Sequence, residues 1–236
     1  MNKIIALFIL VIISGCSNSD DYLKQANTEV KKNYPNIEIQ KITKIDDKLF
    51  EIVIANEIYY LTSDFKHLIA GNVINISTQE NLTESSLKKK RLVILKKLDS
   101  DNMIIFKPKK VNHVLTVFTD TSCPYCQKLH GEVKDLLKNN IEIRYVLFSR
   151  NGNQMDAYKE MVSAWCSDDR KNALEKLYDG QPITEKLDCT NPIIKNFEIA
   201  SKLSITGTPM TFTETGEIIP GYQSSDKIVQ FIENYK

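Results

Sequence analysis

The sequence contains neither a second Cys-x-x-Cys pair nor a closely spaced pair of histidines. Its five cysteines include one such pair, Cys123 and Cys126. Its three histidines are scattered along the chain, at His67, His113 and His130. A structural zinc site needs four ligands, which usually come from two closely spaced pairs. The composition therefore argues against a structural zinc site, and we expect neither a metal nor a cofactor.

The chain also lacks an excess of charge of one sign. It carries 31 Lys and Arg residues against 30 Asp and Glu residues, and only Lys3 of these lies within residues 1–16. The one basic cluster, residues 88–91, falls in a helical pattern, where a solvated helix face is the simplest explanation. Because a nucleic-acid-binding surface usually presents a strong basic field, we expect no nucleic-acid partner. No internal repeat or low-complexity tract is visible.

The apolar run at the N-terminus, residues 4–13, is too short to span a bilayer comfortably, because a membrane-spanning helix needs about 20 residues. Lys3 precedes this run, and Ile-Ser-Gly-Cys at residues 13–16 ends it. A small basic region, a short apolar run and small residues at its end are typical of an export signal. We therefore expect residues 1–16 to be a signal peptide.

The tetrapeptide that ends in Cys16 resembles a bacterial lipobox, in which a peptidase cuts before the cysteine and the cysteine is diacylated. The alternative is an ordinary signal peptide with an incidental cysteine. A lipid on Cys16 would hold the protein at a membrane surface without spanning it. Ser17, rather than Asp, follows the cysteine. In a host that resembles enteric bacteria, this favours the outer over the inner membrane.

The Cys-Pro-Tyr-Cys sequence at residues 123–126 follows a short apolar run, residues 114–118, and opens a segment with a helical pattern. A helix N-terminus supplies positive potential, which favours the thiolate of Cys123. Pro124 suits the first helical position, because its missing N–H would have no partner there. We expect Cys123 to be exposed and Cys126 to be turned inward. This arrangement is typical of a thiol–disulfide exchange site.

Export places the chain in an oxidising compartment, where disulfides persist. Without Cys16, four cysteines remain. The simplest arrangement is local, with one redox pair, Cys123–Cys126, and one structural bridge, Cys166–Cys189. Four cysteines allow three connectivities, and the sequence alone does not choose among them.

Residues 17–78 are expected to form a small domain that consists mostly of sheet. A short amphipathic helix, residues 21–33, is indicated by Leu23, Ala26 and Val30 at helical spacing. The apolar area of the domain is modest for one that stands alone, so we expect the domain to dimerise through a strand edge. The strand-like segments that follow are residues 37–42, 49–54 and 58–61, and then a hairpin of 67–70 and 73–76 around Gly71 and Asn72.

Residues 79–100 are expected to be a linker, with a helix over about 80–98. Its face is basic and only lightly apolar, which favours a linker between two domains. The alternative is an ordinary packed helix of a single domain.

Residues 101–236 form the pattern of one α/β unit. The order of strand, helix, strand, helical insert, hairpin and terminal helix is typical of a thioredoxin-like fold. The expected strands are 103–106, 113–118 and 141–147, followed by a hairpin of 210–212 and 217–219. The expected helices are 123–139, a helical stretch over 153–204 broken near 180–182 and 191–192, and a last helix from about 225.

Four stretches of this unit carry motifs that are specific in combination, although Cys-x-x-Cys alone is not. They are residues 117–130 around the dithiol, Ala-Trp-Cys at 164–166 with Cys189 downstream, Gly-Thr-Pro at 207–209, and Ile-Pro-Gly-Tyr-Gln at 219–223. Together they resemble the DsbC/DsbG family of bacterial periplasmic disulfide isomerases. The N-terminal sheet and the linker helix also fit, so the resemblance covers nearly all of the mature chain.

The resemblance implies an α+β or α/β architecture with three parts. These are a small cystatin-like sheet domain that dimerises, a linker helix, and a thioredoxin-like catalytic domain with a helical insertion. It implies a V-shaped homodimer in the periplasm, whose apolar cleft holds misfolded exported proteins with non-native disulfides. A membrane thiol reductase of the DsbD type is the implied electron donor.

The resemblance also implies roles for individual residues. Cys123 would attack a substrate disulfide and Cys126 would resolve the mixed disulfide. Cys166–Cys189 would be structural. A cis Pro209 would stack against the dithiol.

Three further side chains are candidates near the dithiol. The backbone of Thr208 would bind an extended substrate by strand addition; the alternative for Thr208 and Pro209 is an ordinary turn. Tyr125 either covers an apolar substrate patch or is a plain surface aromatic. His130, one turn after Cys126, either tunes a thiolate or lies at the surface.

Two features depart from the family pattern. Isomerases of this family commonly have Gly-Tyr between the cysteines, whereas this chain has Pro124 and Tyr125. The intervening residues help to set the reduction potential, so the balance of isomerase, reductase and oxidase activity stays open. The lipobox is the second departure.

We predict an enzyme that reduces and isomerises disulfides and binds substrates like a chaperone; the alternatives are a dimeric dithiol oxidase and a lipid-anchored chaperone with secondary redox activity.

Overall fold

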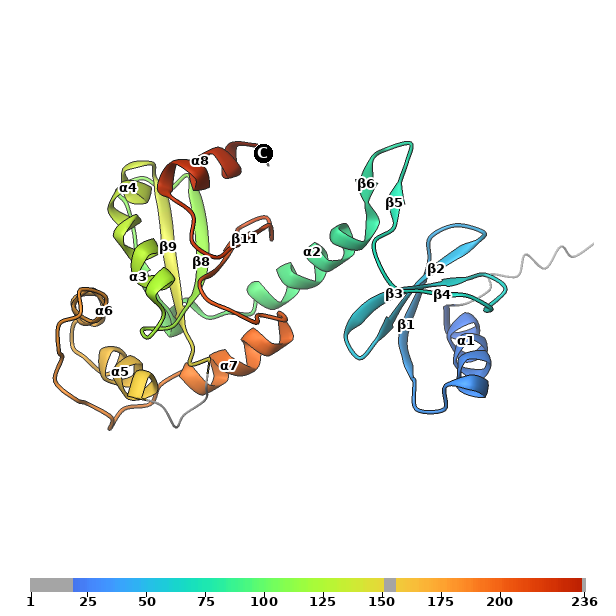
Figure 1. The fold of residues 1–236 in the computed structure, drawn as a ribbon, viewed down its shortest axis with the longest axis horizontal. Coiled ribbons are helices and arrows are strands. Elements are labelled where there is room, and N and C mark those ends of the chain that lie inside the picture. The colour runs from blue at the N-terminus through green and yellow to red at the C-terminus, as the bar shows by residue number, and fades with distance from the viewer. Residues whose placement is uncertain (1–18, 151–155, 235–236) are drawn as a thin grey trace, which may run out of the picture. The chain divides into compact units, whose positions relative to one another are not determined.

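The computed structural model describes residues 19–150 and 156–234 of the 236-residue chain. The expected signal peptide and Cys16 lie outside the described residues. The chain divides into two compact units, Met1–Ser85 and Ser86–Lys236. Figure 1 draws both units. Within the described ranges, no helix has both the length and the apolar character that a membrane span requires.

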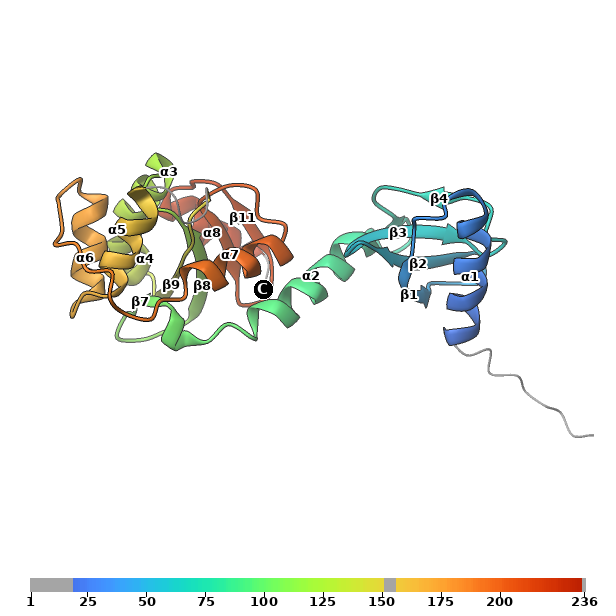
Figure 2. The same cartoon turned by 90° about the horizontal axis from the view of Figure 1, so that it is seen from below.

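The first unit packs one helix, α1, on a four-stranded antiparallel sheet (Figure 2). Ala26 and Val30 are one helical turn apart, so both face the sheet and are buried with Phe50 and Ile52. The alternating pattern of the second strand sends Phe50 and Ile52 to the same face. The elements are α1 (Ser19–Asn33), β1 (Ile39–Lys44), β2 (Leu49–Ile54), β3 (Glu57–Thr62) and β4 (Leu68–Ile69), with the strands in the order β1-β2-β3-β4.

The expected hairpin of residues 67–70 with 73–76 is wrong. The strand β4 pairs with β3, and β5 (Ile74–Asn75) pairs with β6 (Glu80–Asn81) in a separate two-stranded sheet. Side-chain turn contacts decide this pairing. The Asp64 carboxylate accepts the Lys66 N–H at 3.1 Å and turns the chain before β4. The Asn75 amide oxygen accepts the Ser77 N–H at 3.0 Å and turns it after β5.

The helix expected over 80–98 is shorter, because α2 spans Leu82–Leu95. At its first turn, the Thr83 hydroxyl bonds to the Tyr60 hydroxyl at 2.6 Å, within the first unit. Its later turns belong to the second unit.

The basic cluster in these later turns, residues 88–91, was expected to be a solvated helix face. The structure corrects this expectation. Arg91 is 7% exposed and donates from Nε to the Gly216 carbonyl at 2.9 Å. Lys88 pairs with Glu217. Gly216 has φ +85°, and a Cβ on it would lie 2.8 Å from Leu92 Cγ. The later turns of α2 are therefore fitted closely to one turn of the second unit.

The second unit is built on a five-stranded sheet in the order β11-β10-β8-β9-β7. Only β8 and β9 are parallel. Alternate residues of β8 enter two cores, since Leu115 and Val117 face one side and Phe118 faces the other. The strands are β7 (Ile104–Phe106), β8 (His113–Thr119), β9 (Ile141–Leu147), β10 (Met210–Thr213) and β11 (Ile218–Pro220), and a short 3-10 turn, η1 (Ser100–Asn102), precedes them.

Helices cover both faces of this sheet (Figure 1). The helix expected up to residue 139 is two helices that meet at Glu132, whose carboxylate accepts the Ser225 N–H at 2.9 Å. The helical insertion between β9 and β10 has non-helical chain over residues 179–192. The helices are α3 (Pro124–Gly131), α4 (Val133–Lys138), α5 (Asp156–Trp165), α6 (Arg170–Tyr178), α7 (Ile193–Lys202) and α8 (Ser225–Asn234).

Candidate active site

Cys123 occupies the N-cap position of α3, where the chain leaves the parallel strand β8. Its backbone is extended, at φ −94° and ψ 115°, and Pro124 is the first helical residue. The Cys123 sulfur accepts the Cys126 N–H at 3.3 Å. A sulfur atom thus takes the place that a serine or aspartate oxygen usually takes at a helix N-terminus, where negative charge is favoured.

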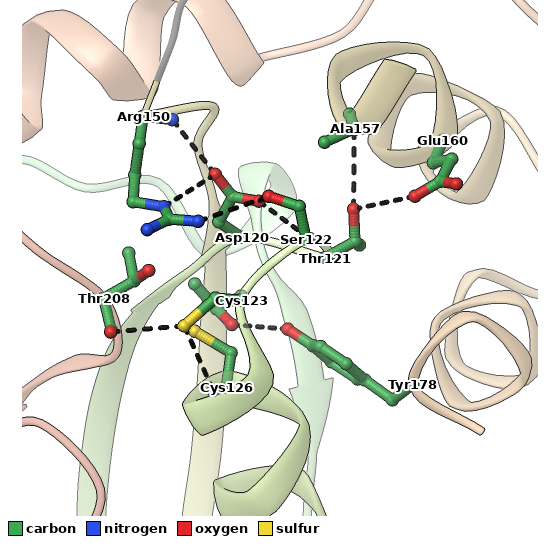
Figure 3. Close-up of polar contacts among 11 residues, drawn as sticks. Asp120, Thr121, Ser122, Cys123, Cys126, Arg150, Ala157, Glu160, Tyr178 and Thr208 are labelled. Atoms are coloured by element: carbon green, nitrogen blue, oxygen red, sulfur yellow. Dashed lines mark hydrogen bonds and ion pairs between the residues drawn. The ribbon is translucent and has the colours of Figure 1, made fainter. Parts of the chain in front are cut away.

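The loop before β10 lies against this sulfur. Cys123 donates from Sγ to the Thr208 carbonyl at 3.3 Å, and the Thr208–Pro209 peptide bond is cis (Figure 3). Burial disfavours the charged form of Cys123, but hydrogen bonds to the sulfur, among them the one from the Cys126 N–H, outweigh it, so the pKa of Cys123 is lowered. The site therefore favours a thiolate at Cys123.

Cys126 has the opposite tendency. It is 1% exposed, and burial raises its pKa to about 12. The two thiols thus lie three residues apart in one helix turn but differ sharply in their ease of ionisation. This asymmetry is what a nucleophile and a resolving thiol require.

The expectation that Cys123 is exposed is wrong, because only 3% of its surface is accessible. Pro124 and Tyr125 lie outside it, and Tyr125 is 57% exposed. The Lys128 ammonium lies 5.3 Å from the centre of the Tyr125 ring. The helix turn that follows Cys123 therefore exposes an aromatic ring with a cation beside it, while Cys123 itself is buried.

A buried carboxylate fixes the loop that leads to Cys123. Asp120 is 1% exposed; its Oδ1 accepts from the Ser122 N–H at 2.9 Å and hydroxyl at 2.6 Å. Its Oδ2 accepts from the Arg150 backbone N–H and Nε, both at 3.1 Å (Figure 3). Burial would raise the pKa of Asp120, but hydrogen bonds from Ser122 and Arg150 outweigh it and lower the pKa.

Sequence reasoning did not single out Asp120 or Arg150. Asp120 lies within the stretch around the dithiol, three residues before Cys123, which is a signal that could have drawn attention to it. Arg150 has no such signal, because it lies 30 residues from Asp120 along the chain.

His130 lies among aromatic rings and not at the open surface. Its ring centre is 4.7 Å from that of Tyr178 and 5.4 Å from that of Phe106, and Nδ1 bonds to the Tyr145 hydroxyl at 3.2 Å. Burial lowers the pKa of His130 to about 4. The imidazole is therefore uncharged near neutral pH, so it does not supply a cation to either thiol.

Cys166 and Cys189 form a disulfide, with Cα atoms 5.7 Å apart and a sequence separation of 23. Of the three connectivities that the sequence allows, the structure has this one, and Cys123 and Cys126 are free thiols. The neighbouring Trp165 donates from its ring N–H to the Thr190 carbonyl at 3.2 Å. In the parts of the chain that the structure describes, no group of three or more His, Cys, Asp or Glu side chains could hold a metal ion.

Comparison with known families gives two matches. Residues 100–236 match the thioredoxin-like domain family, and residues 17–84 match the N-terminal domain family of disulfide bond isomerase proteins. Between them the two matches cover nearly the whole sequence beyond the expected signal peptide.

Curated relatives match along the full chain. The chain is 32% identical to the thiol:disulfide interchange protein DsbC of Dickeya dadantii, covering 100% of this chain and 97% of the relative. It is 31% identical to DsbC of Escherichia coli strain K12, covering 100% and 98%. Among solved structures, a disulfide interchange protein from Neisseria gonorrhoeae superimposes with a TM-score of 0.52 at 22% identity, covering 58% of this chain and 97% of that one. That last likeness concerns the fold alone.

Proposed function

The chain belongs to the DsbC family of thiol:disulfide interchange proteins, and from this premise we propose that Cys123 and Cys126 form its redox pair and act on non-native disulfides of exported proteins. Its class is that of a thiol-disulfide oxidoreductase and isomerase. The observation that carries the residue assignment is the asymmetry of the two sulfurs. Cys123 is a helix N-cap with a lowered pKa, and Cys126 is buried with a pKa of about 12.

The first step uses the Cys123 thiolate. It attacks one sulfur of a substrate disulfide, a bond forms between that sulfur and Cys123 Sγ, and the other substrate sulfur leaves as a thiolate. The N–H of Cys126, 3.3 Å from the sulfur, stabilises the attacking charge.

The mixed disulfide then has two exits. In isomerisation, another substrate thiolate attacks and expels Cys123 unchanged. In reduction, Cys126 attacks Cys123, the substrate leaves reduced, and the active-site disulfide closes. A reductant must then reopen it, and we propose a membrane thiol reductase of the DsbD type. The high pKa of Cys126 favours the first exit, because it slows the second.

Substrate binding is assigned to the surface around the sulfur. The backbone at Thr208 and the cis Pro209 lie against Cys123, which supports strand addition of an extended substrate beside the reacting sulfur. Tyr125 is exposed at the same edge and offers an apolar contact to the residue that follows the substrate cysteine. An apolar contact of this kind suits misfolded chains and chaperone-like binding.

We propose that the first unit dimerises. Four large apolar side chains in its last strands are exposed, which supports an interface with a second copy through β4 and the β5–β6 hairpin. They are Leu68, Ile69, Ile74 and Ile76, at 42, 39, 57 and 91% exposure. The proposed domains are 17–78 for dimerisation, 79–100 for the linker and 101–236 for catalysis; the division between the two compact units falls within this linker.

We place the protein in the periplasm, in keeping with its family. We also propose that Cys16 carries a lipid that anchors the protein to a membrane, and to the outer rather than the inner membrane. The lipobox-like residues 13–16 support the anchor. Mass spectrometry of the protein from a bacterial host, with Cys16→Ala as control, tests it. A mass that matches an unmodified chain cut elsewhere would remove the anchor from the proposal.

One observation favours a second function. Pro124 stands between the cysteines where isomerases of this family commonly have glycine, and this residue helps to set the reduction potential. A strongly oxidising pair would donate its disulfide, as an oxidase does. The equilibrium potential of the pair in a glutathione buffer separates the two: a pair that stays largely reduced supports isomerase and reductase work, and a strongly oxidising one supports the oxidase.

The direct test is the recovery of activity by a ribonuclease refolded from scrambled disulfides. Cys123→Ala should abolish the recovery that the full mature chain catalyses, because no mixed disulfide forms. Cys126→Ala should retain part of it, because isomerisation does not require Cys126. If Cys123→Ala recovered the ribonuclease as fast as the parent, the redox assignment would be wrong. Suppression of aggregation that survives in Cys123→Ala would support a separate chaperone activity.

A further inference from the structure

A closed network of hydrogen bonds lies at the end of the sheet that carries Cys123. The strands β8 and β9 are parallel and end side by side, with Thr119 opposite Leu147. The chain therefore leaves both strands at the same end of the sheet. Asp120 directly follows β8 and Arg150 comes three residues after β9, so their side chains meet although 30 positions separate them. Figure 3 shows both next to the turn that carries Cys123.

Donors saturate the Asp120 carboxylate, which is 1% exposed. Its Oδ1 accepts from the Ser122 N–H and hydroxyl, at 2.9 and 2.6 Å. Its Oδ2 accepts from the Arg150 N–H and Nε, both at 3.1 Å. A carboxylate offers about four lone-pair sites, and these four donors fill them. Asp120 therefore has no site left to accept the proton of Cys123, so it is not the base for that thiol.

Arg150 closes the network. Its Nη2 donates to the Ser122 hydroxyl at 3.3 Å, and that hydroxyl in turn donates to Asp120. The guanidinium thus contacts the carboxylate directly through Nε and a second time through Ser122. The Arg150 side chain is 36% exposed, against 1% for that of Asp120. The pair is therefore a buried anion held by a cation that reaches it from the surface.

The network is close to the sulfur of Cys123. The Cys123 N–H donates to the Asp120 carbonyl at 3.1 Å and closes the turn, and Ser122 directly precedes Cys123. Because consecutive Cα atoms are about 3.8 Å apart, the carboxylate and the sulfur lie within roughly 10 Å of each other. A buried charge is screened little over such a distance. Without a compensating cation, the Asp120 carboxylate would therefore oppose the Cys123 thiolate.

Other charged or titratable groups near Cys123 come from helices. Lys128, in α3, lies over the exposed aromatic ring of the same helix. Glu160, in α5, accepts a hydrogen bond from the loop before Cys123. Both are exposed, so water and salt weaken their effect. Cys126 has a pKa of about 12 and is uncharged at neutral pH. Asp120 is thus the buried anion in this group, and its charge has the greatest reach.

We propose that Arg150 is a positioning residue for Cys123: it compensates the charge of Asp120, so that a buried carboxylate can hold the loop before the thiol without opposing the thiolate. The inference rests on the proposed function, because it concerns Cys123 as the attacking thiol. Asp120 fixes the turn through its four hydrogen bonds. Arg150 determines whether that turn favours or disfavours a negative sulfur.

The two members of the pair should have opposite effects on Cys123. Removing the cation alone leaves a buried anion near the sulfur, which disfavours the thiolate. Removing the anion alone leaves a cation, which favours it. A network that acted only by holding the loop in shape would be weakened in both variants, and both would then lose reactivity. The sign of the change therefore separates an effect of charge from an effect of shape.

The experiment measures the rate of alkylation of Cys123 by iodoacetamide as a function of pH. It uses the full mature chain with Cys16→Ser and Cys126→Ala, so that Cys123 is the one thiol outside the disulfide. Below the midpoint of the parent's profile, Arg150→Gln should react about tenfold more slowly, and its midpoint should move to higher pH. Asp120→Asn should react at least as fast as the parent. Arg150→Lys, which keeps the charge, should stay within about threefold of the parent.

Arg144→Gln is the matched control. The Arg144 side chain is also 36% exposed, and its Nε lies 2.6 Å from a buried carboxylate oxygen of Glu142. Glu142, however, is paired with Val114, near the other end of β8. Arg144→Gln should therefore leave the alkylation profile unchanged.

The double variant, Arg150→Gln with Asp120→Asn, removes both charges and should return alkylation to within about threefold of the parent. Four results would each overturn the inference: slowing by Asp120→Asn, a double variant no faster than Arg150→Gln, Arg150→Lys as slow as Arg150→Gln, or equal slowing by Arg144→Gln. If circular dichroism shows that Arg150→Gln does not fold, the sign of the change in Asp120→Asn decides. A parent profile with its midpoint at or above that of free cysteine would instead contradict the proposed role of Cys123, so the two failures are distinguishable.

Discussion

Two cysteine pairs lie in the second unit; three of the four cysteines are buried, and Cys189 is partly buried. Cys123, Cys126 and Cys166 are 3, 1 and 7% exposed. The difference lies in where each pair stands in the fold. Cys123 and Cys126 share one helix turn, in which the Cys126 N–H points at the Cys123 sulfur. Cys166 and Cys189 lie 23 positions apart and close a loop that contains α6.

The place of each pair in the fold makes one pair reactive and the other structural. A sulfur at a helix N-terminus is stabilised as a thiolate, so the pair can open and close. A sulfur bridge between distant positions restricts the unfolded chain and leaves the folded one little changed. The loop it closes contains Tyr178, whose hydroxyl bonds to that of Thr119, four residues before Cys123.

The largest effect on stability is expected when the bridge is removed. Replacing both Cys166 and Cys189 by serine should lower the free energy of unfolding by about 3 kcal/mol, the loop-closure entropy of a loop of this length. The melting temperature should fall by about 6–12 °C for a unit of this size. Differential scanning calorimetry measures both.

The control removes the same number of cysteines from the other pair. Cys123→Ser with Cys126→Ser should abolish disulfide exchange but lower the melting temperature much less, because no bridge is lost in the reduced protein. Equal losses of stability from the two double variants would show that the two pairs do not differ in their contribution to stability.

A smaller effect is expected at the carboxylate beside the redox pair. Asp120→Asn should cost about 2 kcal/mol in urea unfolding at neutral pH, because hydrogen bonds to a buried charge are replaced by weaker ones. The folded pKa of Asp120 is lowered, so its stabilisation is present above the unfolded pKa and is lost as pH falls through the folded one.

The comparison variant is Asp135→Asn, at an exposed carboxylate that pairs with Lys138 at 2.7 Å. It should change the free energy of unfolding by less than about 0.5 kcal/mol, as surface pairs generally do. If Asp120→Asn cost no more than Asp135→Asn, the buried network would not be what holds the loop before Cys123.

The smallest effect is expected at His130 and depends on pH. The folded pKa of about 4 lies below the ordinary value, so between these two pKa values the unfolded chain binds a proton at His130 and the folded chain does not. The protein should therefore lose stability as pH falls from about 6.5 to about 4, by roughly 1 kcal/mol at about pH 5.8. His130→Phe should flatten this dependence in urea unfolding, whereas His67→Gln at an exposed site should not. An unchanged slope in His130→Phe would contradict this assignment.

Local pattern and chemistry were enough to predict much of this molecule. The strands at 49–54 and 141–147 have the bounds that their apolar patterns indicate. Pro124 begins a helix directly after Cys123, as its fixed backbone favours. The Cys166–Cys189 bridge was the simplest local pairing of the four cysteines and was also implied by the family resemblance, whereas the cis bond before Pro209 followed from the resemblance alone.

What the sequence did not indicate depends on contacts between distant segments. Arg150 meets Asp120 across 30 positions, and Tyr178 meets Thr119 across 59. Neither pairing produces a periodic pattern in the sequence, because each depends on where a loop or a helix packs in the folded chain. Cys123 was expected at the surface because a helix N-terminus usually faces solvent; the loop at Thr208 covers it. Arg91 was assigned to solvent by its charge, yet the Gly216 carbonyl draws it inward.

The turn at Gly216 also has an evolutionary consequence. Its left-handed backbone and the 2.8 Å approach of Leu92 to its missing Cβ mean that a change at either position alters the other's fit. A side chain at position 216 would therefore require that of Leu92 to shift or to be smaller. Substitutions at the two positions are coupled, although 124 positions of sequence separate them.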